Sequence, residues 1–175
     1  MLHRPILRPV PRSEREDPGG SWAATLAGMQ IVFGADHAGY LLKESLVRAA
    51  TAGGYSVADL GTDSPDPVDY PDFAAAVARE VAGGRAERGV LVCGSGAGAS
   101  IAANKVRGVR CAVAHDTYTA HQMVEHDDVN VLAVGSRVVG PALAEEIMFA
   151  FLGARFTNEE RHRRRLNKVI ALEEG

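Results

Sequence analysis

Short runs of apolar residues alternate along this chain with longer stretches in which apolar residues recur at helical spacing. The runs end in a glycine or a polar residue, as buried strands do. The stretch "GYLLKESLVRAATAGG" (39–54) has the pattern of an amphipathic helix closed by glycines. Because continuous apolar strands separated by helices are typical of a parallel sheet covered on both faces, we predict an α/β protein. The expected architecture is a three-layer α/β/α domain with a five-stranded, Rossmann-like parallel sheet.

The pattern assigns each expected element to a residue range. The expected strands cover 30–34, 55–61, 89–94, 109–115 and 129–136. The expected helices cover 39–54, 71–84, 98–106, 117–125, 141–153 and 158–172. Residues 1–28 are rich in proline, arginine and acidic side chains and show no period, so we expect a disordered extension there. Residues 29–175 are then expected to form a single domain.

Composition excludes several functional classes. The formal net charge of -3 argues against nucleic acid as a partner. No apolar run reaches the eighteen residues of a membrane span, so no membrane partner is expected. The two cysteines, Cys93 and Cys111, form neither a disulfide framework nor a metal-binding spacing. We therefore predict no metal and no cofactor, and a reducing, cytoplasmic location.

Polar residues follow the ends of the expected strands. Asp36 and His37 follow the first strand, Cys93 ends the third, and Arg137 follows the fifth. Ligands of open parallel sheets bind beyond the carboxyl ends of the strands. These residues are therefore expected at one site.

The stretch "VLVCGSGAGAS" (90–100) places a thiol where a buried strand changes into a glycine loop. Backbone amides of such a loop hold negative charge, either a phosphate or a developing oxyanion. They also stabilise a thiolate, which acts as a base or a nucleophile. Cys93 is therefore predicted to be functional, whereas Cys111 lies within a strand and is predicted to be core.

Two other interpretations of the same loop remain open. Residues 94–99 fit the relaxed dinucleotide fingerprint, and Asp116 stands about 20 residues further on, where an acid would bind a ribose. This alternative is a dinucleotide-binding module. The loop glycines are also compatible with close packing of a helix on a strand.

Histidines and arginines supply further candidates. His37 and His126 both stand near the expected carboxyl edge of the sheet, where imidazoles suit acid–base work. Arg161 and Arg165 are four residues apart on an expected helix, so they share one face. Two guanidinium groups on one face suit a phosphate dianion.

Five stretches in this order resemble the ribose/galactose isomerase family, to which the type B ribose-5-phosphate isomerases belong. They are "GADHAGYLLK" (34–43), "DYPDFA" (69–74), "CGSGAGASIAANK" (93–105), "EHDDVNVLAVGSRVVG" (125–140) and "RHRRRL" (161–166). The resemblance implies metal-independent aldose–ketose isomerisation of a phosphorylated sugar through a cis-enediolate. It favours ribose 5-phosphate and ribulose 5-phosphate, as in the pentose phosphate pathway. Allose 6-phosphate, galactose 6-phosphate or a tetrose phosphate are the alternative substrates.

The resemblance also implies roles for individual residues. Cys93 corresponds to the base that moves a proton between C1 and C2, and His126 to the residue that opens the furanose ring with help from Asp36. Ser95 stands where the family contacts the substrate. The loop residues expected to stabilise the enediolate are Gly94, Gly96, Ala97 and Gly98.

The remaining implied contacts concern the phosphate, the sugar and the second subunit. The phosphate is expected to contact His37, Arg137, Arg161 and Arg165. Tyr70 corresponds to a residue that lines the site, and Asp127 stands where relatives usually carry asparagine. Family sites lie between subunits, so a homodimer or homotetramer is expected in which His126 and Arg137 serve the neighbour's Cys93. A non-catalytic phosphosugar sensor is a third hypothesis.

Overall fold

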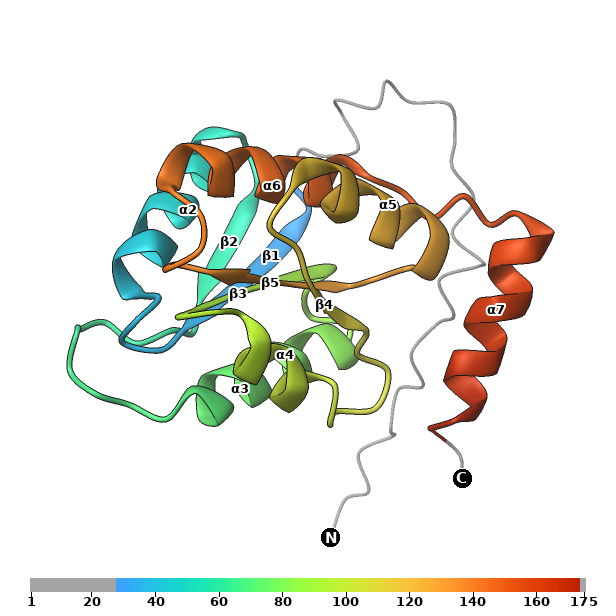
Figure 1. Ribbon diagram of the computed structural model, residues 1–175, viewed down its shortest axis with the longest axis horizontal. Coiled ribbons are helices and arrows are strands. Elements are labelled where there is room, and N and C mark those ends of the chain that lie inside the picture. Colours follow the sequence, from blue (N-terminus) through green and yellow to red (C-terminus); the bar gives the residue numbers. More distant parts are fainter. Residues whose placement is uncertain (1–27, 174–175) are drawn as a thin grey trace, which may run out of the picture.

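The computed structural model describes residues 28–173 and shows a five-stranded sheet between two layers of helices (Figure 1). The predicted extension, residues 1–28, lies outside the described residues except for Gly28. The strands are β1 (Gln30–Ala35), β2 (Ser56–Asp59), β3 (Arg88–Cys93), β4 (Cys111–Val113) and β5 (Val131–Gly135). The helices are α2 (Tyr40–Ala52), α3 (Tyr70–Ala82), α4 (Ala97–Ala103), α5 (Thr117–Asp127), α6 (Pro141–Gly153) and α7 (Glu160–Ala171).

All five strands run parallel, in the order β2-β1-β3-β5-β4, which confirms the predicted fold class. Every residue of β3 and β5 is buried, because these strands lie inside the sheet and helices cover both of their faces. Their continuous apolar sequences follow from this position.

β4 is shorter than expected, three residues where the sequence predicts seven. It lies at the edge of the sheet and pairs only with β5 among the described strands. The side-chain amide of Asn104 accepts a hydrogen bond from the Cys111 amide at 2.8 Å and donates to the Cys111 carbonyl at 2.8 Å. A side chain therefore satisfies edge groups that would otherwise need another strand.

The two faces of the sheet bury separate apolar clusters. On one face Phe33, Val92 and Leu132 pack against α2, α5 and α6. On the other face Leu91 and Cys93 pack against α3 and α4, whose buried positions are mostly alanine and valine. Figure 1 shows these helices above and below the sheet. The side chain of Cys93 therefore belongs to the α3/α4 face.

The chain changes direction between β1 and β3. After β1 it crosses through α2 to β2 on one side, and after β3 it leaves through α4 toward the opposite edge. The two connections lie on opposite faces of the sheet, so the segments that follow β1 and β3 diverge and leave a crevice. This crevice is where the candidate site forms.

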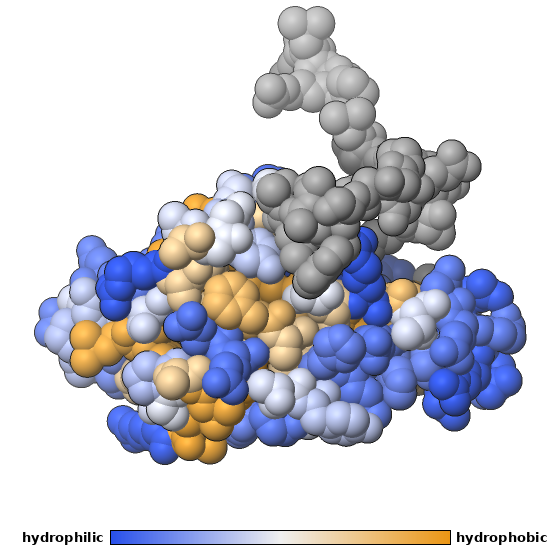
Figure 2. Space-filling view, turned by 90° about the horizontal axis from the view of Figure 1, so that it is seen from above, coloured by the Kyte–Doolittle hydropathy of each residue, from blue (hydrophilic) through white to orange (hydrophobic). Residues whose placement is uncertain are grey.

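α7 extends beyond the sheet and packs against α5 (Figure 1). Most of its side chains are charged or polar and exposed, and Figure 2 shows its surface as largely hydrophilic. His162 is its one buried residue in the described part of the chain. Within residues 28–173 no helix is long and apolar enough to cross a membrane.

Candidate active site

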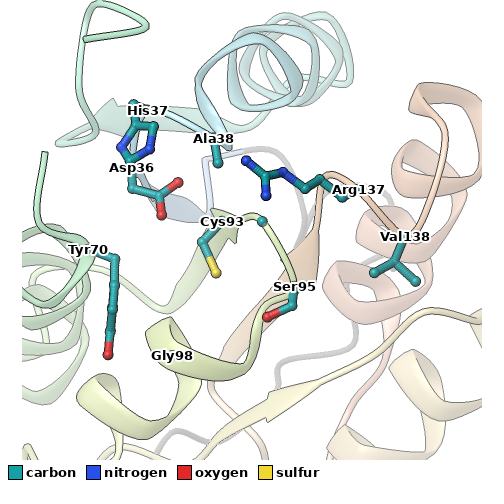
Figure 3. A pocket seen from close by; sticks show the side chains of 10 residues that line it. Asp36, His37, Ala38, Tyr70, Cys93, Ser95, Gly98, Arg137 and Val138 are labelled. Atoms are coloured by element: carbon teal, nitrogen blue, oxygen red, sulfur yellow. The ribbon is translucent and has the colours of Figure 1, made fainter. Parts of the chain in front are cut away.

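A pocket of about 440 Å³ opens at the carboxyl ends of β1, β3 and β5 (Figure 3). Its walls come from the segments after these strands and from the start of α3 and α4. The lining residues are Asp36, His37, Ala38, Tyr70, Cys93, Gly94, Ser95, Gly98, Arg137 and Val138. Eight of them were predicted from the sequence, and Ala38 and Val138 are the additional ones. They follow the predicted residues His37 and Arg137 directly, so the strand-end pattern was the signal that pointed to them.

Cys93 is the last residue of β3, and its side chain is 5% exposed. Figure 3 shows its thiol directed into the space between Tyr70 and Ser95. The amide of Gly96 donates a hydrogen bond to Sγ at 3.1 Å. Gly96 has a φ of 84°, which favours glycine, and this turn brings its amide back toward the sulfur. The loop therefore holds the thiol in place and offers a donor to negative charge that develops on it.

The second cysteine has a different environment. Cys111 is buried in β4 and does not line the pocket. Burial raises the pKa of its thiol to about 12, and a hydrogen bond with Ser100 only partly opposes this effect. Cys111 is therefore a protonated core residue near neutral pH, which confirms its predicted place in the core.

Asp36 and His37 directly follow β1 at one wall of the pocket. The Asp36 carboxylate accepts a hydrogen bond from the Gly39 amide at 3.0 Å, at the start of α2. His37 Nδ1 accepts a hydrogen bond from the Val68 amide at 3.2 Å. Because Nδ1 accepts, the ring proton lies on Nε2, which makes His37 a hydrogen-bond donor at that atom. A donor at Nε2 suits an anionic ligand.

The loop after β5 is tied to the loop after β3. The Ser136 amide donates to the Cys93 carbonyl at 2.8 Å, and the Arg137 amide donates to the Gly94 carbonyl at 3.1 Å. The family resemblance implies that Arg137 serves the neighbouring subunit's Cys93. In the structure Arg137 lines the pocket of its own chain, since these backbone bonds hold it beside Gly94.

Tyr70 forms the opposite wall with the first turn of α4. A Cβ placed on Gly98 would lie 2.8 Å from Cζ of Tyr70, closer than ordinary packing allows. The absence of a side chain at this position therefore lets the Tyr70 ring lie against α4. Ser95 stands at the mouth of the pocket, and its hydroxyl accepts a hydrogen bond from the Ala97 amide at 3.3 Å.

Six predicted residues do not line this pocket, and two of these belong to the loop. Gly96 and Ala97 lie directly behind the lining residues, and Gly96 contacts the sulfur. The other four are located at the end of α5 and on α7, and they are His126, Asp127, Arg161 and Arg165. The Arg161 guanidinium pairs with Glu159 at 2.8 Å.

His162 is a residue that the sequence did not single out. Its ring is buried and lies against the ring of His126, with centroids 4.1 Å apart. Burial lowers the pKa of His162, and the positive charges of His126 and Arg161 act in the same direction. The sequence did hold a signal for this position. Among residues 161–165, four are arginines that stay charged, and His162 alone readily becomes neutral, so it is the side chain best suited to burial.

The strand order contradicts the dinucleotide-binding alternative. In a dinucleotide-binding fold, the acid that binds the ribose follows the strand adjacent to the one that carries the glycine loop. Here the loop follows β3 and Asp116 follows β4, and β5 lies between these two strands. Asp116 instead caps α5, and its carboxylate accepts a hydrogen bond from the Thr119 amide at 2.7 Å. This hydrogen bond lowers the pKa of Asp116. Across the described part of the chain, no group of three or more His, Cys, Asp and Glu side chains is placed to hold a metal ion.

The sequence matches the family described as Ribose/Galactose Isomerase over residues 31–169. The chain belongs to the ribose/galactose isomerase family. The matched range covers all five strands except the first residue of β1, and α7 as far as Val169.

Individual family members match most of the chain. Ribose-5-phosphate isomerase B of Escherichia coli is 46% identical over 83% of this chain and 97% of its own length. D-erythrulose-4-phosphate isomerase 2 of Mycolicibacterium smegmatis is 39% identical, with 83% and 97% covered. The structure of Mycoplasma genitalium ribose-5-phosphate isomerase B with bound ribulose-5-phosphate matches with a TM-score of 0.79 at 38% identity, with 83% and 96% covered.

Proposed function

We propose that this chain interconverts D-ribose 5-phosphate and D-ribulose 5-phosphate through a cis-enediolate, with Cys93 as the base. The observation that carries the proposal is the position of the Cys93 thiol. It points into a pocket of about 440 Å³ that His37 and Arg137 also line, and its sulfur accepts a hydrogen bond from the Gly96 amide. The family membership and the 46% identical isomerase of Escherichia coli support the same reaction.

The proton transfer uses one thiol for both carbons. The Cys93 thiolate takes the proton from C2 of the open-chain aldose, a C1–C2 double bond forms, and the carbonyl electrons move to O1. The hydroxyl proton of O2 then passes to O1, and the protonated thiol returns its proton to C1. Stabilisation of the negative enediolate is assigned to the amides of the loop 94–98 that do not already donate to Cys93 Sγ or Ser95 Oγ.

The phosphate is assigned to the basic groups around the pocket. His37 donates from Nε2, and the guanidinium of Arg137, which Figure 3 shows beside Ala38, offers several donors. Tyr70 closes the side of the pocket next to α4.

The ring-opening residues are assigned to a second subunit. His126 and Asp127 lie at the end of α5, and Arg161 and Arg165 lie on the exposed face of α7, outside the pocket of their own chain. In a homodimer with a shared site, these residues complete the partner's pocket. Asp127 accepts hydrogen bonds but does not donate them when ionised, so it favours a substrate hydroxyl as its partner.

The first test is formation of ribulose 5-phosphate from ribose 5-phosphate in the presence of a chelator. We expect rapid turnover that the chelator leaves unchanged. Arabinose 5-phosphate is the matched control, because its C2 hydrogen lies on the opposite face, where a single base does not reach it. Turnover of a tetrose or hexose phosphate in place of ribose 5-phosphate would correct the substrate, and no turnover of any would refute the proposal.

The shared site is tested by combining two inactive subunits. Cys93→Ala and His126→Asn chains with different tags are co-expressed, and the mixed dimer is purified through both tags. One of its two sites then carries both defects and the other carries neither, so we expect about half of the wild-type activity. An inactive mixed dimer would show that each site is complete within one chain, and failure to recover a mixed assembly would contradict the dimer.

A further inference from the structure

The burial of His162 is exceptional within α7. The helix is strongly basic and exposed, yet the His162 side chain is 2% exposed. Arginines precede and follow it along the chain, so the helix places one neutral ring against the protein and its charges outside. The surface that receives this ring is the last turn of α5, which carries His126.

Two contacts fix the His162 ring. Its centroid lies 4.1 Å from that of His126, with 34° between the ring planes. Its Nδ1 lies 2.7 Å from the hydroxyl oxygen of Thr157, in the segment that precedes α7. Thr157 in turn donates to the carbonyl of Glu125 twice, from its amide at 3.0 Å and from its hydroxyl at 3.1 Å. Because Glu125 directly precedes His126, these contacts connect His162 to the His126 segment both directly and through Thr157.

The number of available protons decides which group donates in the hydrogen bond between Thr157 and His162. A threonine hydroxyl has one proton, and here it goes to the Glu125 carbonyl. The hydroxyl therefore accepts from His162 Nδ1, and the neutral His162 ring carries its proton there. Burial and the nearby His126 and Arg161 lower the pKa of His162, which favours the same neutral form. The ring against His126 is thus anchored in one tautomer and one orientation.

We propose that Thr157 and His162 form a positioning pair that holds the His126 ring in the orientation needed to open the sugar ring. This inference rests on the proposed function. The pair acts through two contacts on adjacent residues: the backbone of Glu125 and the imidazole of His126. It also joins α7 to α5. His162 is buried against the His126 ring and Thr157 binds the Glu125 backbone, so both act through other residues and are positioning residues.

The test separates ring opening from proton transfer. Exchange of the C1 hydrogen of ribulose 5-phosphate with solvent deuterium needs only the enediolate step, because this ketose has its O5 esterified and forms no furanose. Net consumption of ribose 5-phosphate needs ring opening as well. In Thr157→Val and His162→Phe we expect net consumption to fall by about tenfold to a hundredfold. Exchange should stay within about twofold of wild type, because Cys93 and its loop are untouched.

Matched variants define the chemical group responsible. Thr157→Ser keeps the hydroxyl and should restore net consumption, whereas Thr157→Val keeps the shape without it. His162→Phe keeps an aromatic ring and loses the donor to Thr157. The proton NMR signal of the His126 ring should move in Thr157→Val and return in Thr157→Ser. Because Thr157 is exposed, its variants test the pair even where a change at buried His162 prevents folding.

Each outcome has a separate meaning. Equal losses of exchange and net consumption would show a general structural role and overturn the inference. Unchanged net consumption in Thr157→Val would overturn it as well. A wild-type protein that supports neither exchange nor consumption would instead refute the proposed function.

Discussion

Cys93→Ala is expected to lower turnover of ribose 5-phosphate by about a thousandfold or more, the scale of losing a general base. The variant removes the one group in the pocket assigned to move the proton between C2 and C1. Binding should survive, since the basic groups His37 and Arg137 are unchanged. Steady-state kinetics and a direct titration with ribulose 5-phosphate measure the two effects separately.

Cys111→Ala is the matched control for this experiment. Both cysteines are buried at strand positions, but Cys111 lies outside the pocket and its thiol has a pKa of about 12. Its replacement should leave turnover near the wild-type value. If Cys93→Ala kept a tenth of the activity or more, the base would have to be sought elsewhere in the pocket.

Gly39→Ala is expected to lower the free energy of unfolding by about 3 kcal/mol or more. A Cβ at this position would lie 2.1 Å from the carbonyl oxygen of Val92 and 2.5 Å from its carbonyl carbon. Both atoms are backbone of the central strand β3, so the clash is relieved only by moving the start of α2 away from the sheet. Chemical denaturation followed by circular dichroism measures the loss.

Gly153→Ala serves as the control for Gly39→Ala. It lies at the end of α6, and a Cβ there meets no heavy atom within 4 Å. Alanine favours a helix over glycine, so stability should stay the same or rise slightly. Equal stability of the two variants would mean that α2 and β3 do not approach each other as closely as the structure shows.

The layered fold was predictable because each element has its own local signal. Apolar runs mark the strands, helical spacing marks the helices, and the alternation of the two specifies a parallel sheet. The order of the strands was not predictable, because periodicity carries no information about which strands pair. For this reason the sequence left the dinucleotide-binding alternative open, whereas the position of β5 between β3 and β4 excludes it.

The pocket was predictable to the extent that it follows strand ends. Asp36, His37 and Cys93 were expected at one edge, and the structure brings them together. The contact of His162 with His126 was not predictable, because it depends on how α7 packs against α5. Arg137 was assigned to the partner by resemblance, whereas the backbone bonds that keep it beside Gly94 appear only in three dimensions.

The late position of β5 in the chain has a consequence for synthesis on the ribosome. β4, residues 111–113, emerges before β5, residues 131–135, yet among the described strands β5 is the one it pairs with. Until β5 arrives, β3 also lacks its neighbour on that side. A nascent chain that stalls in this interval therefore presents an apolar strand edge to other chains, the kind of surface that chaperones protect.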